Sequence, residues 1–117
     1  MLLKHTRGDT ARLRLKCEDL AADGVTWSVR DFTGYTLRWI IVSTDPQAGV
    51  VLVNSAGVWD DLVNGIAGYD PQPGDFPGAN VIEYAETEIE ATSQLGVVET
   101  YPKRVGKQPT LIIPQLG

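Results

Sequence analysis

Apolar and polar residues alternate along several short stretches of this chain, which is the pattern of β-strands with one buried face. In residues 11–17 every second residue is apolar, from Ala11 to Cys17, and basic residues stand between them. Residues 35–44 alternate in the same way, but Ile40 and Val42 make part of the second face apolar as well. This second strand is therefore expected to be central in a sheet, or covered at one end.

Other stretches predict further strands, turns and one loop. Strands are expected over residues 25–29, 50–54, 80–92 and 97–102, and a last short strand begins at residue 109 and is closed by Pro114. A helix is the alternative for the glutamate-rich residues 80–92, but the strict alternation and the flanking turns favour a strand. Residues 55–70 are ambiguous between one helical turn and a short irregular strand. A polar turn is expected over 18–24 and a proline-rich loop over 71–78.

About seven short strands, frequent turn signals and no sustained helical period predict an all-β protein, an antiparallel sandwich or barrel. The chain has 117 residues, which predicts a single domain over residues 1–117 with one core. Hydrophobic residues make up 43% and charged residues 21%, values that are ordinary for a folded globular protein.

Charge and targeting signals narrow the class of protein further. The formal net charge is -5, whereas nucleic-acid binders carry a basic surplus, so no nucleic-acid partner is expected. The opening "MLLKHT" has no apolar core of a secretory signal, and no apolar run approaches the roughly 20 residues of a membrane span. We therefore expect a soluble protein made in a reducing cytosol, with no membrane partner, and the short ends suit a complete gene product. Cys17 is the only cysteine and is expected to be a small buried hydrophobe.

Candidates for catalysis or metal binding are weak. The only histidine, His5, lies in an N-terminus that we expect to be frayed, so it cannot serve as the base of a catalytic triad. One histidine and one cysteine do not make a structural zinc site. Acidic neighbours such as Asp60 and Asp61 are expected in solvent rather than across a cleft. The sequence therefore predicts no enzyme, no cofactor and no metal.

Charged and aromatic residues point instead to an interaction hypothesis. Three basic residues share one strand face and three glutamates share another. The two stripes form a cross-strand ladder if their strands are neighbours, complementary surfaces between subunits if they lie apart, or ordinary solvated faces. The three tryptophans are expected first in the core, although Trp27 and Trp59, near turns, could be interface anchors. The candidate interface residues are Arg12, Arg14, Lys16, Trp27, Trp59, Tyr69, Phe76, Glu86, Glu88 and Glu90.

Three segments in order resemble the N-terminal domain of phage baseplate upper proteins. They are "RGDTARLRLKCED", "DG" with "DFTGYTLRW", and "GYDPQPGDFPGANVIEYAETEIEATSQLGVVETYP". The shared elements are a Gly-Asp before the first strand, a Thr-Gly turn before the second long strand, and a later series of turns and strands. That later series comprises Tyr69, Gly74-Asp75, Pro77-Gly78, residues 84–90, Gly96 and Thr100-Tyr101-Pro102. Residues 31–34 lack the family's leucine before Thr-Gly, and "GAN" lengthens the loop before Val81.

This resemblance implies an immunoglobulin-like antiparallel β-sandwich that joins other tail or baseplate proteins in a tailed-phage virion. It implies a structural role, a homo-oligomer and synthesis in the bacterial host cytoplasm. The alternative is a carbohydrate- or receptor-binding module at the tail tip, which needs Trp27, Trp59 and Tyr69 together on one open surface. The tripeptide Arg7-Gly8-Asp9 is interpreted as a turn into the first strand and not as an adhesion motif.

Overall fold

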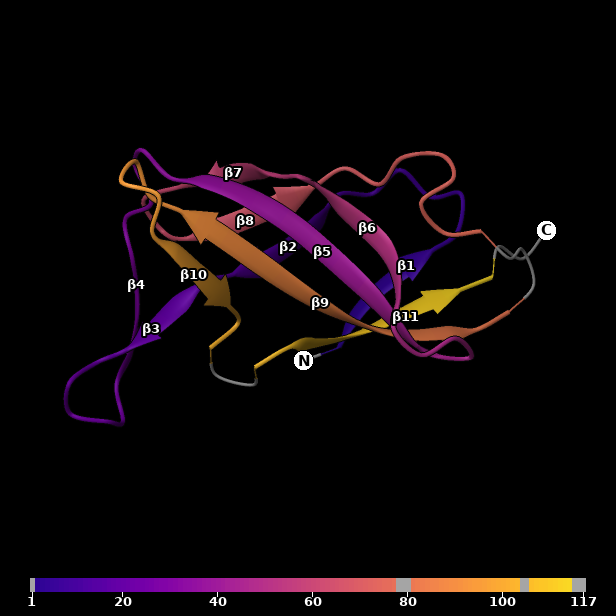
Figure 1. Cartoon of the computed structure of the whole chain (residues 1–117), viewed down its shortest axis with the longest axis horizontal. Coiled ribbons are helices and arrows are strands. Elements are labelled where there is room, and N and C mark those ends of the chain that lie inside the picture. Colours follow the sequence, from indigo (N-terminus) through magenta and orange to yellow (C-terminus); the bar gives the residue numbers. More distant parts are fainter. Residues whose placement is uncertain (1, 78–80, 104–105, 115–117) are drawn as a thin grey trace.

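The computed structural model describes residues 2–77, 81–103 and 106–114, and the described residues form eleven β-strands and no helix (Figure 1). In chain order the strands are β1 (Leu3–Thr6), β2 (Leu13–Lys16), β3 (Glu18–Leu20), β4 (Trp27–Val29), β5 (Thr36–Asp45), β6 (Val50–Ala56), β7 (Val58–Asp61), β8 (Ile66–Tyr69), β9 (Glu83–Thr92), β10 (Val98–Tyr101) and β11 (Gln108–Ile113).

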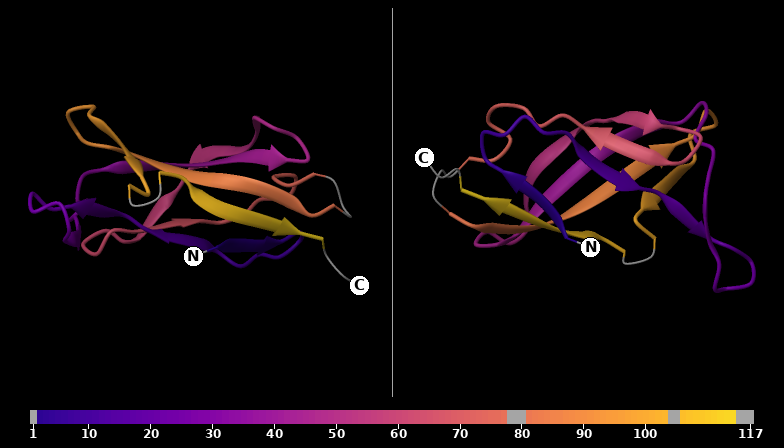
Figure 2. Two further views of the ribbon diagram at one scale, coloured as in Figure 1. Left: turned by 90° about the horizontal axis from the view of Figure 1, so that it is seen from below. Right: turned by 180° about the vertical axis from the view of Figure 1, so that it is seen from behind.

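Two sheets form the body of the molecule. The larger sheet has the order β1-β11-β9-β5-β6, with β10 beside the other end of β9, and the smaller sheet has the order β2-β8-β7. Strands β3 and β4 form a separate hairpin. Strands β5 and β9 lie in front of β2 and β8 in Figure 1, and the view from behind in Figure 2 reverses this order. The predicted all-β sandwich is therefore confirmed.

The core lies between the two sheets and follows the alternation seen in the sequence. The inward residues of β5 and β9 include Trp39, Ile41 and Ile89, each with no exposed surface. Cys17 is likewise fully buried and is a free thiol, which confirms its interpretation as a small buried hydrophobe. Burial raises the pKa of this thiol to about 12.

The strand count and the N-terminal region differ from the prediction. The described residues form eleven strands instead of about seven, because segments expected as turns also pair. Residues 18–20 form β3 within the predicted polar turn, and the ambiguous residues 55–70 contain both β7 and β8. Strand β1 is the larger correction: it pairs with β11 in parallel, from Leu3 opposite Thr110 to Thr6 opposite Ile113. The predicted frayed N-terminus is wrong, since Leu3 and His5 face the core.

Strand boundaries shift by a few residues from those predicted. Ala11 is exposed and precedes β2, which begins at Leu13. Strand β9 begins at Glu83, whereas the prediction began at residue 80. Residues 78–80, which belong to the predicted loop and strand, lie outside the described residues, as do residues 115–117.

The chain crosses from the larger to the smaller sheet at Gly57, between β6 and β7. The Gly57 amide donates a 3.1 Å hydrogen bond to the Leu37 carbonyl. A Cβ at this position would lie 2.1 Å from Leu37 Cδ1 and 2.9 Å from the Gly68 carbonyl oxygen. Glycine is therefore required here by the close approach of two neighbouring strands.

Candidate interaction surfaces

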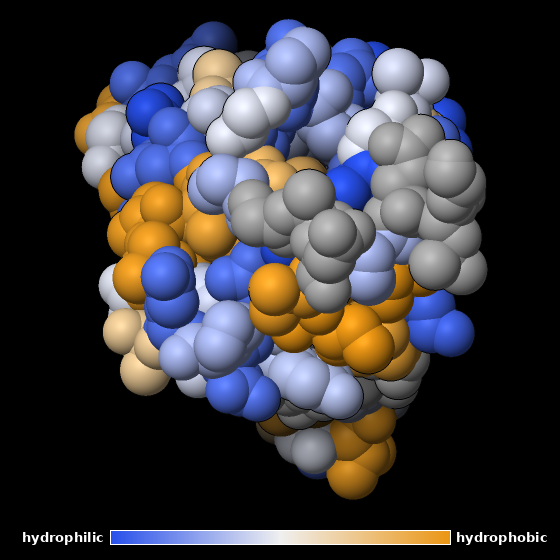
Figure 3. All heavy atoms as spheres, turned by 90° about the vertical axis from the view of Figure 1, so that its right-hand side faces the viewer, coloured by the Kyte–Doolittle hydropathy of each residue, from blue (hydrophilic) through white to orange (hydrophobic). Residues whose placement is uncertain are grey.

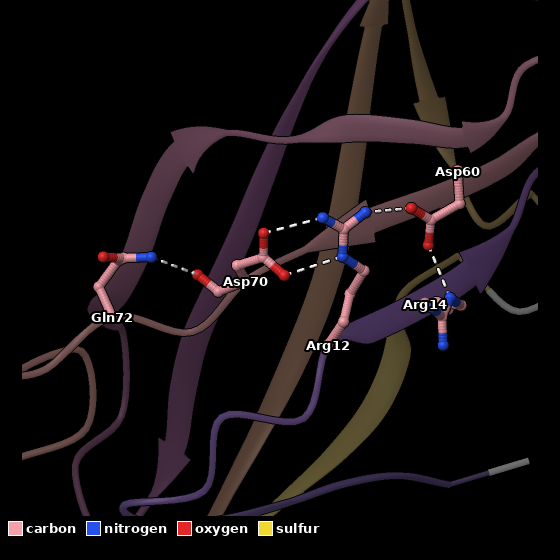
Figure 4. Close-up of polar contacts among 5 residues, drawn as sticks. All are labelled: Arg12, Arg14, Asp60, Asp70 and Gln72. Atoms are coloured by element: carbon pink, nitrogen blue, oxygen red, sulfur yellow. Dashed lines mark hydrogen bonds and ion pairs between the residues drawn. The ribbon is translucent and has the colours of Figure 1, made fainter.

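Arg12 is the centre of a charged cluster on the outer side of the smaller sheet (Figure 4). Its Nε and Nη2 atoms each donate a 2.8 Å hydrogen bond to the Asp70 carboxylate, and its Nη1 donates to Asp60. Arg14 Nε donates to the second oxygen of Asp60 at 2.7 Å. The two-pronged contact with Arg12 lowers the pKa of Asp70. Two of the three residues of the basic stripe are thus bound within the chain.

A glycine makes this cluster possible. Strand β8 lies between β2 and β7, with Gly68 opposite Arg14 on one side and Val58 on the other. A Cβ on Gly68 would lie 2.7 Å from Asp60 Oδ2. Because glycine has no side chain, the Asp60 carboxylate can extend across β8 and reach the arginines on β2. The register of β7 also shifts between Trp59 and Asp61, and such an irregularity changes the direction of the side chain between them.

The two charged stripes lie apart. The basic stripe is on β2 in the smaller sheet and the glutamates are on β9 in the larger sheet, so they form no cross-strand ladder. Lys16 is exposed and, among the described residues, forms no ion pair. Glu86, Glu88 and Glu90 alternate with the buried residues of β9 and therefore point away from the core.

The larger sheet supplies few cations to these glutamates. Arg38 on β5 lies opposite Glu90 in the register, but it donates hydrogen bonds to the side chain and the carbonyl of Asn54. Within the described part of the chain none of the three glutamates takes part in an ion pair. The stripe is therefore an acidic surface beside the half-buried Ile40 and Val42.

The aromatic candidates mostly pack inside the fold. The Trp59 ring stacks on Phe32 with ring centroids 4.3 Å apart, and its indole N–H donates to the Tyr35 carbonyl. Tyr69 is 4% exposed and its hydroxyl donates to Asp75 at 2.6 Å. These interactions explain why the two residues face the core of the smaller sheet instead of solvent.

The remaining two aromatic candidates lie elsewhere. Phe76 packs against the core and contacts His5, with ring centroids 4.9 Å apart. Trp27 is half-buried on β4 of the separate hairpin, whereas Trp59 and Tyr69 are in the smaller sheet. The open aromatic surface required by a sugar- or receptor-binding module is therefore not formed by these residues.

Arg7 is buried, which the sequence did not indicate. It is 7% exposed, and its Nη2 lies 3.1 Å from the carboxylate of Glu83, which is 5% exposed. Arg7 also donates to the carbonyls of Phe76 and Val81, and Ser43 donates to the second oxygen of Glu83 at 2.7 Å. This network ties β1 to the segment that leads into β9.

The neighbouring Gly8 and Asp9 form a turn, as predicted. Gly8 has a φ of 82°, a conformation that favours glycine. The Asp9 amide donates to the Thr6 carbonyl, and the Asp9 side chain accepts from the Ala11 amide, each at 3.0 Å. With Arg7 buried, the tripeptide is not presented as an exposed recognition motif.

A second charged cluster ties the β3–β4 hairpin to β10. Asp19 accepts hydrogen bonds from Lys103 and from the Tyr101 hydroxyl, each at 2.9 Å, and forms an ion pair with Arg30. Arg30 also pairs with Glu99. Burial alone would raise the pKa of Asp19, but the hydrogen bonds from Lys103 and Tyr101 outweigh it and the net shift is downward.

His5 lines a cavity of about 210 Å³ together with Arg7, Asp9 and the 71–76 loop. His5 is 4% exposed, and burial lowers the pKa of its side chain. Asp61, a carboxylate considered for hydrolysis, accepts hydrogen bonds from the amide and side chain of Asn64, which lower its pKa.

No group of three or more metal-ligating residues occurs in residues 2–77, 81–103 and 106–114. Nor does this part contain a helix long and apolar enough to cross a membrane.

The comparisons with known proteins show a structural likeness but no family. No family model and no curated protein matches the chain. Among solved structures, CopC from Methylosinus trichosporium OB3b is similar over 98% of this chain and 88% of its own length. The two sequences are 11% identical and the TM-score is 0.44. This likeness transfers no ligand or activity to the chain.

The phage function is corrected by this comparison. The solved structure named above is CopC and not a phage tail or baseplate protein, so the predicted tail or baseplate role, with its tail-tip alternative, is contradicted. No finding tests the family resemblance itself, the virion location, or the expectations of a homo-oligomer without enzymatic activity and without nucleic-acid or membrane partners. These stay predictions.

Proposed function

We propose that this chain is a non-catalytic structural module that assembles with copies of itself through its larger sheet. The observation that carries the proposal is an apolar group on the outer face of that sheet. Val51 on β6 is 56% exposed and lies opposite the half-buried Val42 on β5, beside Ile40. Exposed apolar side chains grouped on one face mark surfaces of protein association.

The state of the polar groups supports the same function. Arg12 binds both Asp60 and Asp70, and Asp19 is likewise paired with Arg30 and Lys103. Groups engaged in this way hold strands together and are not poised for proton transfer or nucleophilic attack. The fold therefore supplies a rigid body, and the apolar part of its surface supplies the contacts.

Other exposed aliphatic residues occur outside the outer face. Figure 3 views the right-hand end of Figure 1, where hydrophobic side chains lie in separate groups among hydrophilic ones. Val81 and Ile82, which precede β9, are 45% and 51% exposed. These scattered residues are ordinary for a protein surface, so the proposal rests on the sheet and not on them.

The test is the solution mass measured by light scattering after size exclusion, from about 1 micromolar to about 1 millimolar protein, the range of weak dissociation constants. We expect the mass to rise with concentration from that of a 12.7 kDa monomer to twice that value. A mass of 12.7 kDa at every concentration would overturn the proposal.

A further inference from the structure

His5 is a buried imidazole without a polar partner in its own chain. It lies on β1, is 4% exposed, and packs its ring against Phe76 with centroids 4.9 Å apart. Among the described residues, neither of its ring nitrogens takes part in a hydrogen bond or an ion pair. Buried polar side chains in proteins are nearly always hydrogen-bonded, so this imidazole requires an explanation.

The imidazole lies beside a cavity of about 210 Å³ between the turn after β1 and the loop after β8. These two segments lie side by side at the upper right of Figure 1. Asp9 and Thr10 make part of the lining polar, whereas Phe76, Pro71 and Pro73 make part of it apolar. A cavity of about 150 Å³ is enough to hold benzene. The cavity beside His5 therefore has room for a six-membered ring that carries one polar group.

The free polar atoms of this lining are mainly hydrogen-bond acceptors. Asp9 accepts from the Ala11 amide through Oδ1 at 3.0 Å, and its Oδ2 has no partner within the described chain. Arg7 also lines the cavity, but its guanidinium donates to Glu83 and to backbone carbonyls. The neutral imidazole of His5 has one acceptor nitrogen. A ligand that matches these groups must bring hydrogen-bond donors.

The charges around His5 favour a cation over an anion. The charged groups that act on its ring are the carboxylates of Asp9 and Asp75 and the guanidinium of Arg7. The charge of Arg7 is matched by Glu83, 3.1 Å away, whereas the groups that donate to Asp75 are neutral. Burial lowers the pKa of His5 below its usual value of 6.5, so its ring adds no positive charge at neutral pH.

We propose that this cavity binds a small organic ammonium ion, which donates to the His5 ring nitrogen, the Asp9 carboxylate and the Thr10 hydroxyl. An ammonium group has donors and no acceptor, which suits a lining rich in acceptors. The apolar body of the ligand lies against Phe76, and an aromatic ring attracts cations as well. This inference goes beyond the proposed self-association, because His5 faces the core and not the outer face of the larger sheet.

The test is an NMR titration that observes the imidazole ring of His5, whose signals are unique because His5 is the only histidine. The probes are benzylammonium, benzyl alcohol and benzoate, which have similar size but different charge, at about pH 7.5 and constant ionic strength. We expect benzylammonium to shift the signals saturably, with a dissociation constant on the order of 1 mM. Benzyl alcohol should bind at least about tenfold more weakly, because charge-assisted hydrogen bonds are the stronger ones, and benzoate should not bind.

Two matched variants separate this site from a general effect of charge. Asp9→Asn removes the carboxylate charge but keeps an oxygen that can accept from the Ala11 amide. Asp23→Asn is the control, because Asp23 accepts from backbone amides in the same way in the β3–β4 turn. Asp9→Asn should raise the dissociation constant of benzylammonium about tenfold, since one charge-assisted hydrogen bond is lost. Asp23→Asn should leave it within about twofold, as expected for a distant site.

Several outcomes overturn the proposal. One is the absence of a saturable shift with every probe, as expected for a cavity that holds only water. Another is equally tight binding of benzyl alcohol or benzoate, and a third is an Asp9→Asn variant that binds benzylammonium as wild type does. Nα-acetyl-lysine amide presents the same ammonium on a peptide side chain, and tighter binding of this probe than of benzylammonium overturns the assignment to a free amine. Self-association is measured without these probes, so each of the two proposals can fail by itself.

Discussion

Replacing Arg7 with methionine tests whether the buried ion pair is a main support of the fold. Methionine keeps much of the length of the side chain but removes all its donors. The substitution leaves the Glu83 carboxylate, 5% exposed, without its arginine, and it frees the carbonyls of Phe76 and Val81. The segment leading into β9 then loses its attachment to β1.

The magnitude follows from the burial of both partners. Removing one member of a buried ion pair costs about 3–5 kcal/mol, because the remaining charge is uncompensated. The whole stability of a domain is about 5–15 kcal/mol, so the loss is a large part of it. Arg14 is the matched control, since it also binds a carboxylate but its side chain is 62% exposed. Arg14→Met should cost about 0–1 kcal/mol, as surface ion pairs do.

The assay is urea unfolding followed by tryptophan fluorescence and circular dichroism. With a slope of about 2 kcal/mol per molar urea, Arg7→Met should lower the midpoint by about 1.5–2.5 M. The double variant Arg7→Met with Glu83→Gln should recover part of that loss, because it removes the stranded charge. The reasoning is refuted if Arg7→Met is no more destabilising than Arg14→Met, or if the double variant is no more stable than Arg7→Met alone.

Two further predictions concern buried titratable groups. Burial lowers the pKa of His5, so the unfolded chain takes up a proton at a higher pH than the folded protein does. The contribution of His5 to the free energy of unfolding is therefore fully present above about pH 6.5 and decreases as the pH falls below that value. His5 is the only histidine, so the urea midpoint should change less between pH 7.5 and pH 5 in His5→Gln than in wild type. An equal change in the two proteins would contradict the assignment of this pH dependence to His5. Burial raises the pKa of the Cys17 thiol to about 12, so a thiol reagent at pH 8 should label native protein far more slowly than urea-unfolded protein. Equal labelling rates would show that Cys17 is accessible.

The long strands were predictable because each has one buried face and an unbroken period of two. Strand β5 is shifted by one residue from the predicted segment 35–44, and β9 lies inside the predicted segment 80–92. Strands β1 and β3 were missed for the opposite reason. The sequences LKHT in β1 and EDL in β3 each contain a single apolar residue, so neither shows an alternation that would distinguish a strand from a turn.

The clusters that hold the sheets together could not be predicted from the sequence. Arg7 and Glu83 are 76 positions apart, and Arg12 and Asp70 are 58 apart. Periodicity assigns a residue to a face but does not identify its partner across the fold. The basic stripe was thus placed on the correct face of β2, while its neutralisation by Asp60 depended on Gly68 in a strand between them.

The parallel pairing of β1 with β11 determines how the molecule responds to mechanical force. They are the first and last strands of the described residues, and they run in the same direction over four paired positions. A hydrogen bond from the Arg7 amide to the Ile113 carbonyl extends the pairing. Tension between Leu3 and Ile113 pulls them in opposite directions along their length. Parallel hydrogen bonds are evenly spaced, so they share the load in shear and must yield together, whereas a terminal antiparallel hairpin would open one bond at a time. Stretching resistance is therefore concentrated in this single strand pair, whose rupture sets the rate of forced unfolding.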